Sequence, residues 1–300
     1  PRTVAFDVDD NDPDDQYAKL YSESVVDTIN DLSLPRYGLG NYENKDPDTP
    51  PSQREAAALR DLSRAGKRLM GFCRTNLFKR LESSGMAFIQ SVERHILRNY
   101  VYLHAIKQGL DLPIGSQGAE LLDTRLNDED SDRMAELFGA GNDAGQPEQA
   151  SQAYSEDHFR ARAAEIYSLY AEHHKTRFRW LRSDLFTKKL AQHLRSDAKK
   201  LLRILKENGN WNPEHDAKLA ALCELLGQTH MADKVLVFTQ FADTVRYLDT
   251  QLRARGFEDH AGVWGDTANP TDLAWRFSPV SNNKRDRVSP ARELRILIAT

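Results

Sequence analysis

Cysteine and long apolar runs are both scarce in this 300-residue chain, and each scarcity excludes a class of protein. The two cysteines, Cys73 and Cys223, lie far apart in the sequence, which excludes a small disulfide scaffold and favours reduced, buried thiols in an intracellular protein. No apolar run approaches the roughly 20 residues that a membrane-spanning helix needs. We therefore expect no membrane among the partners of this chain.

Motifs of several enzyme classes are also missing. The sequence holds no GxxxxGK(S/T) phosphate-binding loop, no strand-borne DExx pair, no HExxH zinc motif and no GxSxG nucleophile turn. The acidic residues 127–130 lack both a preceding apolar strand and the glycine spacing of a calcium loop. We therefore expect no metal site and no catalytic residue within this chain, and interpret residues 111–157 as an acidic, solvated and partly disordered linker.

The net charge is only −4, but the charges are segregated along the chain. Counted as Lys+Arg minus Asp+Glu, residues 1–55 carry −8 and 111–157 carry −10, whereas 56–110 carry +7 and 158–206 carry +9. The last block, 207–300, is nearly neutral at −2. Basic blocks of this kind indicate contact with a polyanion or with an acidic protein surface.

The C-terminal third alternates apolar runs with helical periodicity. Residues 235–238 form a short apolar run that favours a strand buried on both faces. A helical stripe follows, and Gly256 stands where that helix should end. Runs at 261–264 and 294–299 predict two more strands, with a helix between them that begins at Pro270. The order strand, helix, strand, helix, strand predicts a parallel α/β layer.

Residues 52–208 are predicted to be mainly helical, and residues 158–206 are expected to form long basic helices. The fold class expected is therefore mixed α and α/β, with a long helical region followed by a partial parallel lobe. The apolar positions predicted to form the helical core are Leu59, Leu62, Leu69, Ile89, Val92, Ile96, Tyr100, Leu103, Leu181, Leu185, Leu194, Ala198, Leu201 and Leu205.

Several segments resemble the Swi/Snf-type branch of superfamily-two ATP-dependent DNA translocases, in particular its bacterial members. KVLVFTQFADTVRYLDTQL at 234–252 is similar to the family's fourth helicase motif. VWGDTANPTDLAWRF at 263–277 resembles the segment that follows, and RILIAT at 295–300 resembles the opening of the fifth motif. LFKRLESS at 77–84 and HDAKLAALCELL at 215–226 resemble two further segments of the family.

The order of these segments implies how the chain is divided. Residues 1–51 would hold the exit from a first RecA-like lobe, including a half-buried strand at 2–9, and a linker. Residues 52–210 would be a helical insertion that contains the acidic linker 111–157. Residues 211–300 would be the first half of the second RecA-like lobe, so we expect a fragment of a longer chain that ends inside that lobe.

The resemblance also implies an activity, in which ATP hydrolysis opens and closes a cleft between two RecA-like lobes and drives movement along DNA. ATP and Mg²⁺ are therefore expected in the parent chain, whereas this chain alone should be inactive and bind neither. Double-stranded DNA and a protein complex on DNA are the implied partners, and the implied location is the cytoplasm, at the nucleoid. The residues that match cleft-lining positions are Thr239, Gln240, Phe241, Arg276 and Thr300.

The basic residues leave more than one interpretation open. Lys79 and Arg80 are either phosphate contacts or ion-pair partners, and the basic block 158–206 is either a nucleic-acid surface or a solvated face. A non-catalytic helical adaptor that binds an acidic protein or RNA is the alternative function, and a nucleotide-independent α/β enzyme is a third. The candidate DNA contacts are Lys79, Arg80, Arg177, Arg179, Arg182, Lys188, Lys189, Lys199 and Lys200.

Overall fold

The computed structural model describes residue 6 and residues 8–115, 154–265 and 267–300, apart from the side chains of residues 64–68. The fold is mixed and mainly helical, with one parallel and one antiparallel sheet in the described part, which confirms the mixed class. The chain forms two compact units. The sheet unit comprises Pro1–Leu20, Arg80–Ala87 and Trp211–Thr300, and the helical unit comprises Tyr21–Lys79 and Phe88–Asn210.

This division differs from the colinear one that the sequence suggested. The short segment Arg80–Ala87 lies inside the expected helical insertion, yet it belongs to the sheet unit. The N-terminal segment up to Leu20 belongs to that unit as well. Of the strand predicted at 2–9, residues 6, 8 and 9 are described and are not in a strand, and the remainder lies outside the described residues.

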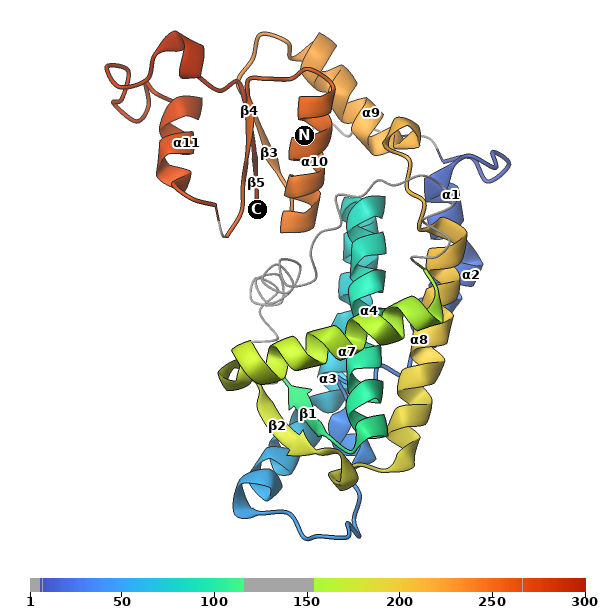
Figure 1. Cartoon of the computed structure of the whole chain (residues 1–300). Helices are drawn as coiled ribbons and strands as arrows, with labels where there is room; N and C mark the ends of the chain where they lie inside the picture. Colours follow the sequence, from blue (N-terminus) through green and yellow to red (C-terminus); the bar gives the residue numbers. More distant parts are fainter. Residues whose placement is uncertain (1–5, 7, 116–153, 266) are drawn as a thin grey trace. The chain divides into compact units, whose positions relative to one another are not determined.

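The sheet unit is built on the predicted alternation of strands and helices, shown in Figure 1. Its three strands are parallel and lie in the order β3-β5-β4, with α10 on one side and α11 on the other. Gly256 follows α10 with a φ of +84°, a conformation that favours glycine, as expected at a helix stop. The elements are α1 (Gln16–Tyr21), α9 (Ala217–Glu224), β3 (Val235–Phe238), α10 (Ala242–Ala254), β4 (His260–Val263), α11 (Pro270–Phe277) and β5 (Ile296–Ala299).

The first strand corrects one prediction. Val235 and Val237 pack on the core that α10 forms with β5, but Leu236 and Phe238 face the other way and are 44% and 72% exposed. Strand β3 is therefore buried on one face only. The reason is tertiary: β3 lies at an edge of the sheet, and α11 has eight residues and packs beside β4.

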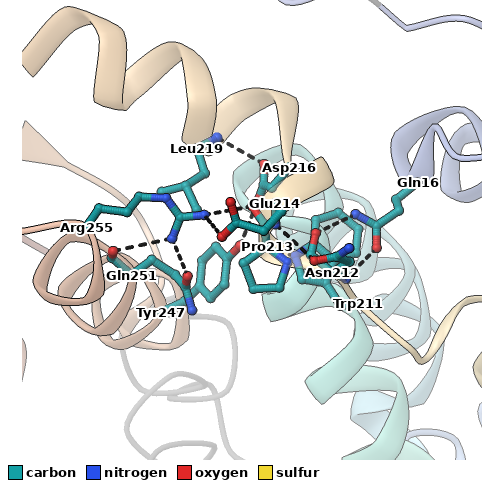
Figure 2. A network of polar contacts seen from close by, with 10 residues as sticks. All are labelled: Gln16, Trp211, Asn212, Pro213, Glu214, Asp216, Leu219, Tyr247, Gln251 and Arg255. Atoms are coloured by element: carbon teal, nitrogen blue, oxygen red, sulfur yellow. Dashed lines mark hydrogen bonds and ion pairs between the residues drawn. The ribbon is translucent and has the colours of Figure 1, made fainter. Parts of the chain in front are cut away.

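A buried carboxylate, Asp216, ties three segments of the sheet unit together. Tyr17 of α1 and Tyr247 of α10 donate hydrogen bonds to it at 3.3 and 2.8 Å. The backbone N–H of Leu219 donates at 3.0 Å, so that Asp216 caps α9 (Figure 2). Burial and the adjacent carboxylate raise the pKa of both tyrosines, which therefore remain donors at neutral pH.

Trp211 extends the hydrogen-bond network around Asp216. Its indole Nε1 donates to the Tyr247 hydroxyl at 3.1 Å, and its ring packs edge-on against Tyr17. A Cβ at Gly85 would lie 2.2 Å from the Trp211 ring, so only glycine fits there. The segment that contains Gly85 is thereby held in the sheet unit by contacts with residues that are distant from it in the sequence.

The helical unit contains long helices and one short antiparallel sheet. Strand β1 pairs with β2, with Asp111 opposite Arg182 and Ile114 opposite Arg179. All the predicted core positions are buried except Leu103, which is half-buried. The elements are α2 (Glu23–Asn30), α3 (Gln53–Ser83) up to Lys79, α4 (Gly85–Gln108) from Phe88, β1 (Asp111–Ile114), α7 (Glu156–His173), β2 (Arg179–Arg182) and α8 (Lys188–Asn208).

The prediction of long basic helices over 158–206 was wrong between α7 and α8. Residues 177–180, RFRW, alternate arginine with an aromatic side chain, which is the period of a strand, and residues 179–182 form β2. The expectation of a linker over 111–157 was wrong at both ends, because residues 111–114 form β1 and Ser155 caps α7. Residues 116–153, which include the acidic run 127–130, lie outside the described residues.

Candidate functional site at the carboxyl edge of the parallel sheet

Thr239 and Thr300 lie at the same edge of the parallel sheet. The N–H of Thr239 donates to the carbonyl of Ala299 at 3.0 Å, and the N–H of Thr300 donates to Val263 at 3.2 Å. Gln240 follows Thr239 and is exposed. Because parallel strands end together, this edge gathers polar side chains where α/β proteins place ligands.

A second segment brings a further hydroxyl to this edge. Ser83 Oγ lies 2.9 Å from Thr239 Oγ1 and 2.8 Å from Thr244 Oγ1, in the first turn of α10. Ser83 and Thr239 are 156 positions apart in the sequence. The three hydroxyls can donate and accept hydrogen bonds, so they suit recognition of a polar ligand rather than attack on one.

Arg80 and Asp243 form a buried ion pair beside the three hydroxyls. Arg80 Nη1 lies 2.6 Å from Asp243 Oδ2, with both side chains largely shielded from solvent. The guanidinium also sits over the Phe241 ring, 4.5 Å from its centroid. Of the two interpretations of Arg80, ion-pair partner is therefore the one that the structure shows. Phe241 is buried beneath this cation and presents no free ring to a ligand.

Arg276 is not brought to the carboxyl edge. Its carbonyl accepts from the N–H of Leu294, which precedes β5, whereas Thr300 follows β5. Its Nε donates to the Arg292 carbonyl at 2.8 Å. Because α11 runs back along the sheet, its last turn reaches the amino edge. The expectation that Arg276 lines the same site as Thr239 and Thr300 is therefore wrong.

The candidate DNA contacts other than Arg80 belong to the helical unit, and they separate into two groups. Arg182 is bound by Glu55 at 3.0 Å and Asp184 at 2.9 Å, Arg179 pairs with Asp61, and Lys200 donates to a backbone carbonyl. Lys79 is half-buried. The residues that are exposed, with no ion pair in the described part of the chain, are Arg177, Lys188, Lys189 and Lys199.

Helix α8 carries most of these exposed cations. Lys188 and Lys199 share its outer face with Arg195, Arg203 and Lys206, all exposed, while the opposite face of α8 is buried. Lys206 was not predicted, although its helical spacing from Arg203 and Lys199 would have revealed it. A row of cations of this kind can contact successive phosphates of a nucleic acid.

Sequence reasoning missed Ser83, Asp243 and Thr244. The LFKRLESS resemblance pointed to the segment that holds Ser83, but no local signal placed it beside α10. Arg246 and Trp264, whose guanidinium and ring lie 5.3 Å apart, were also missed at this end of the unit.

Two kinds of feature are absent among the described residues. These residues hold no group of three His, Cys, Asp or Glu side chains placed to bind a metal ion. None of the described helices combines the length and apolar content needed to cross a bilayer. Comparison with protein-family models, curated proteins and solved structures finds no match to this chain.

Proposed function

We propose that this chain is part of an ATP-dependent double-stranded DNA translocase of the Swi/Snf type. In this proposal the sheet unit contributes half of a RecA-like lobe, and its carboxyl edge forms one wall of the nucleotide-gated cleft. Further sequence of the parent protein would supply the phosphate-binding loop and the Mg²⁺ ligands, since no such motif occurs in these 300 residues.

The observation that carries the proposal is the meeting of two segments at this edge. LFKRLESS and KVLVFTQFADT each resemble a part of the same family. Ser83 from the first lies within hydrogen-bond distance of Thr239 and Thr244 from the second, and Arg80 pairs with Asp243. Two resemblances found separately in the sequence therefore support each other through side-chain contacts.

The role of the carboxyl edge follows from its chemistry. Thr239, Gln240 and Thr300 offer hydroxyl and amide groups to a nucleotide or to a DNA phosphate, and none of them can act as a base at neutral pH. Arg80 is bound to Asp243 in the first turn of α10, so we assign it the role of positioning that turn. The exposed cations of α8 supply the attraction to DNA.

The test of catalysis is ATP hydrolysis by the parent protein, measured with and without duplex DNA. DNA-stimulated hydrolysis is expected, and Ser83→Ala and Thr239→Val should reduce it without lowering the unfolding temperature by more than a few degrees. Ser281→Ala is the matched control, because it removes the hydroxyl of an exposed serine of the same unit. A well-folded parent protein that hydrolyses no ATP would overturn the translocase proposal and favour the helical adaptor.

The test of DNA binding uses the 300-residue chain. Its affinity for a short duplex should fall with salt with a log–log slope of about −0.9 per phosphate contacted. Lys188→Gln with Lys199→Gln should reduce that slope by about 2. The charge-matched control is Lys45→Gln with Lys107→Gln, two exposed positions outside α8. The assignment to α8 is contradicted if the affinity for the duplex does not change with salt, or if the two double substitutions reduce the slope equally.

A further inference from the structure

The two outer strands of the parallel sheet, β4 and β3, differ in whether their outward backbone groups are bonded. In β4 the carbonyl of Val263 accepts from the N–H of Thr300, so Val263 points toward β5 and its neighbour Gly262 points away from it. The outward N–H of Gly262 donates to Asp249 Oδ1 at 3.1 Å. A side chain of α10 therefore closes the β4 edge.

The β3 edge has no such cover among the described residues. The N–H of Val235 donates to the Arg295 carbonyl at 2.9 Å, and that of Thr239 donates to the end of β5 at 3.0 Å. Because the direction of the backbone groups alternates along a strand, the N–H and C=O groups of Leu236 and Phe238 point away from the sheet. No residue in the described part of the chain hydrogen-bonds these outward groups.

Leu236 and Phe238 are also the residues whose side chains β3 exposes. The strand contains no proline and no charged side chain, and its pairing with β5 has no bulge, so the usual features that protect an edge strand are missing. The preceding Lys234 is paired within the sheet unit, with its Nζ 2.8 Å from Glu293 Oε1. An edge of this kind is a template for pairing with another strand.

We propose that a second copy of this chain pairs with β3, antiparallel to it and about a two-fold axis at Val237. In this register Leu236 lies opposite Phe238 of the second copy, and the two residues exchange backbone hydrogen bonds in both directions. The symmetric pair does the same on the other side of the axis. All the outward groups of both residues are then bonded, in an isologous interface.

The side chains of β3 suit pairing with an identical strand. Leu236 and Phe238 of the two copies meet on the same face of the extended sheet as cross-strand apolar pairs. Lys234 lies opposite Gln240 of the second copy, so no like charges face each other. Because pairing uses the β3 edge and Asp249 closes the β4 edge, the assembly ends at a dimer. The proposal rests on β3 alone and does not depend on the activity proposed for the parent protein.

Sedimentation velocity of the 300-residue chain over a range of protein concentrations tests the proposal, and a monomer–dimer equilibrium is expected. Phe238→Lys removes an apolar side chain at both symmetric positions and puts a cation opposite Leu236, so it should raise the Kd of dimerisation roughly tenfold or more. Phe238→Leu, which stays apolar, should raise it less. Val280→Lys is the matched control and should leave the Kd unchanged, because Val280 is as exposed as Phe238, at 71% against 72%, and belongs to the same unit.

Amide hydrogen exchange identifies the contact as strand pairing. The N–H groups of Leu236 and Phe238 should exchange more slowly as the dimer forms, whereas those of Val235 and Val237, which point toward β5, should be protected at every concentration. Circular dichroism checks that each variant is folded. A chain that stays monomeric overturns the proposal, as do assemblies larger than a dimer or an equal loss of affinity in Val280→Lys. A dimer in which the exchange of Leu236 and Phe238 is unchanged overturns pairing through β3.

Discussion

Each unit contains a polar centre, and the two centres are built on groups of opposite charge. In the sheet unit one buried carboxylate, Asp216, accepts hydrogen bonds from two tyrosines and a backbone N–H. In the helical unit the Arg36 guanidinium donates to Asn99 Oδ1 at 2.8 Å and lies 3.2 Å from His95 Nδ1. The first centre joins segments that are far apart in the sequence around an anion, and the second joins Arg36 to helix α4 around a cation. In both, neutral side chains of the same unit hydrogen-bond the charged group.

The largest effect is expected on removing the acceptor at the centre of the sheet unit. Asp216→Ala leaves the hydroxyls of Tyr17 and Tyr247 and the helix α9 N-terminus without their acceptor. Buried donors without acceptors cost about 1–3 kcal/mol each, so the free energy of unfolding should fall by roughly 3 kcal/mol or more. Denaturant unfolding measures it.

Glu214→Ala is the control for Asp216→Ala. Glu214 pairs with Arg255 at 2.6 Å, but its side chain is mostly exposed, and such pairs contribute at most about 1 kcal/mol. Equal losses in the two variants would show that Asp216 is no more important than a surface carboxylate.

A smaller loss in the free energy of unfolding is expected at the packing contact between Gly85 and Trp211, beside the hydrogen-bond network around Asp216. Gly85→Ala places a methyl group against the Trp211 ring, and overpacking of this kind costs about 1–3 kcal/mol. The cost should shrink when Trp211 is replaced by Leu, because the smaller side chain leaves room. A double-mutant cycle on the free energy of unfolding tests this coupling. Additive losses would mean that Gly85 is required for another reason.

The smallest effect is a pH dependence in the sheet unit. Burial disfavours charge on His260, but its hydrogen bonds with Asp249 and with the Phe257 carbonyl outweigh burial and raise its pKa. That contribution to stability is complete below the unfolded pKa of about 6.5 and is lost as pH rises through the raised value. The same pair lowers the pKa of Asp249, whose contribution is present above about pH 3.9 and is lost as pH falls through the lowered value.

We therefore expect the free energy of unfolding to decline as pH rises above about 6.5, by less than the loss in Gly85→Ala. His260→Gln should flatten that decline, whereas the exposed His173→Gln should not. A decline that persists unchanged in His260→Gln would assign the pH dependence to another group.

Much of the sheet unit could be predicted from local sequence. Apolar runs and helical periodicity located β3, β4, β5 and α10, because the spacing of apolar residues within each element depends on its secondary structure and on the face that it buries. Thr239 and Thr300 could be placed at one edge for a similar reason, since parallel strands end together. Arg276 could not be placed, because the direction of α11 along the sheet moved it to the other edge.

The sequence by itself determined where the three strands of the parallel sheet and most of the helices form, where charge accumulates and which positions enter the helical core. Tertiary structure decided which of those charged side chains form ion pairs. Arg80 pairs with Asp243 and Arg182 with Glu55, whereas Lys199 has no ion-pair partner among the described residues. It also joined Ser83 to Thr244 across 161 positions. The physical reason is that periodicity and propensity act over one or two turns, whereas ion pairing and hydrogen bonding depend on distances that only the folded chain sets.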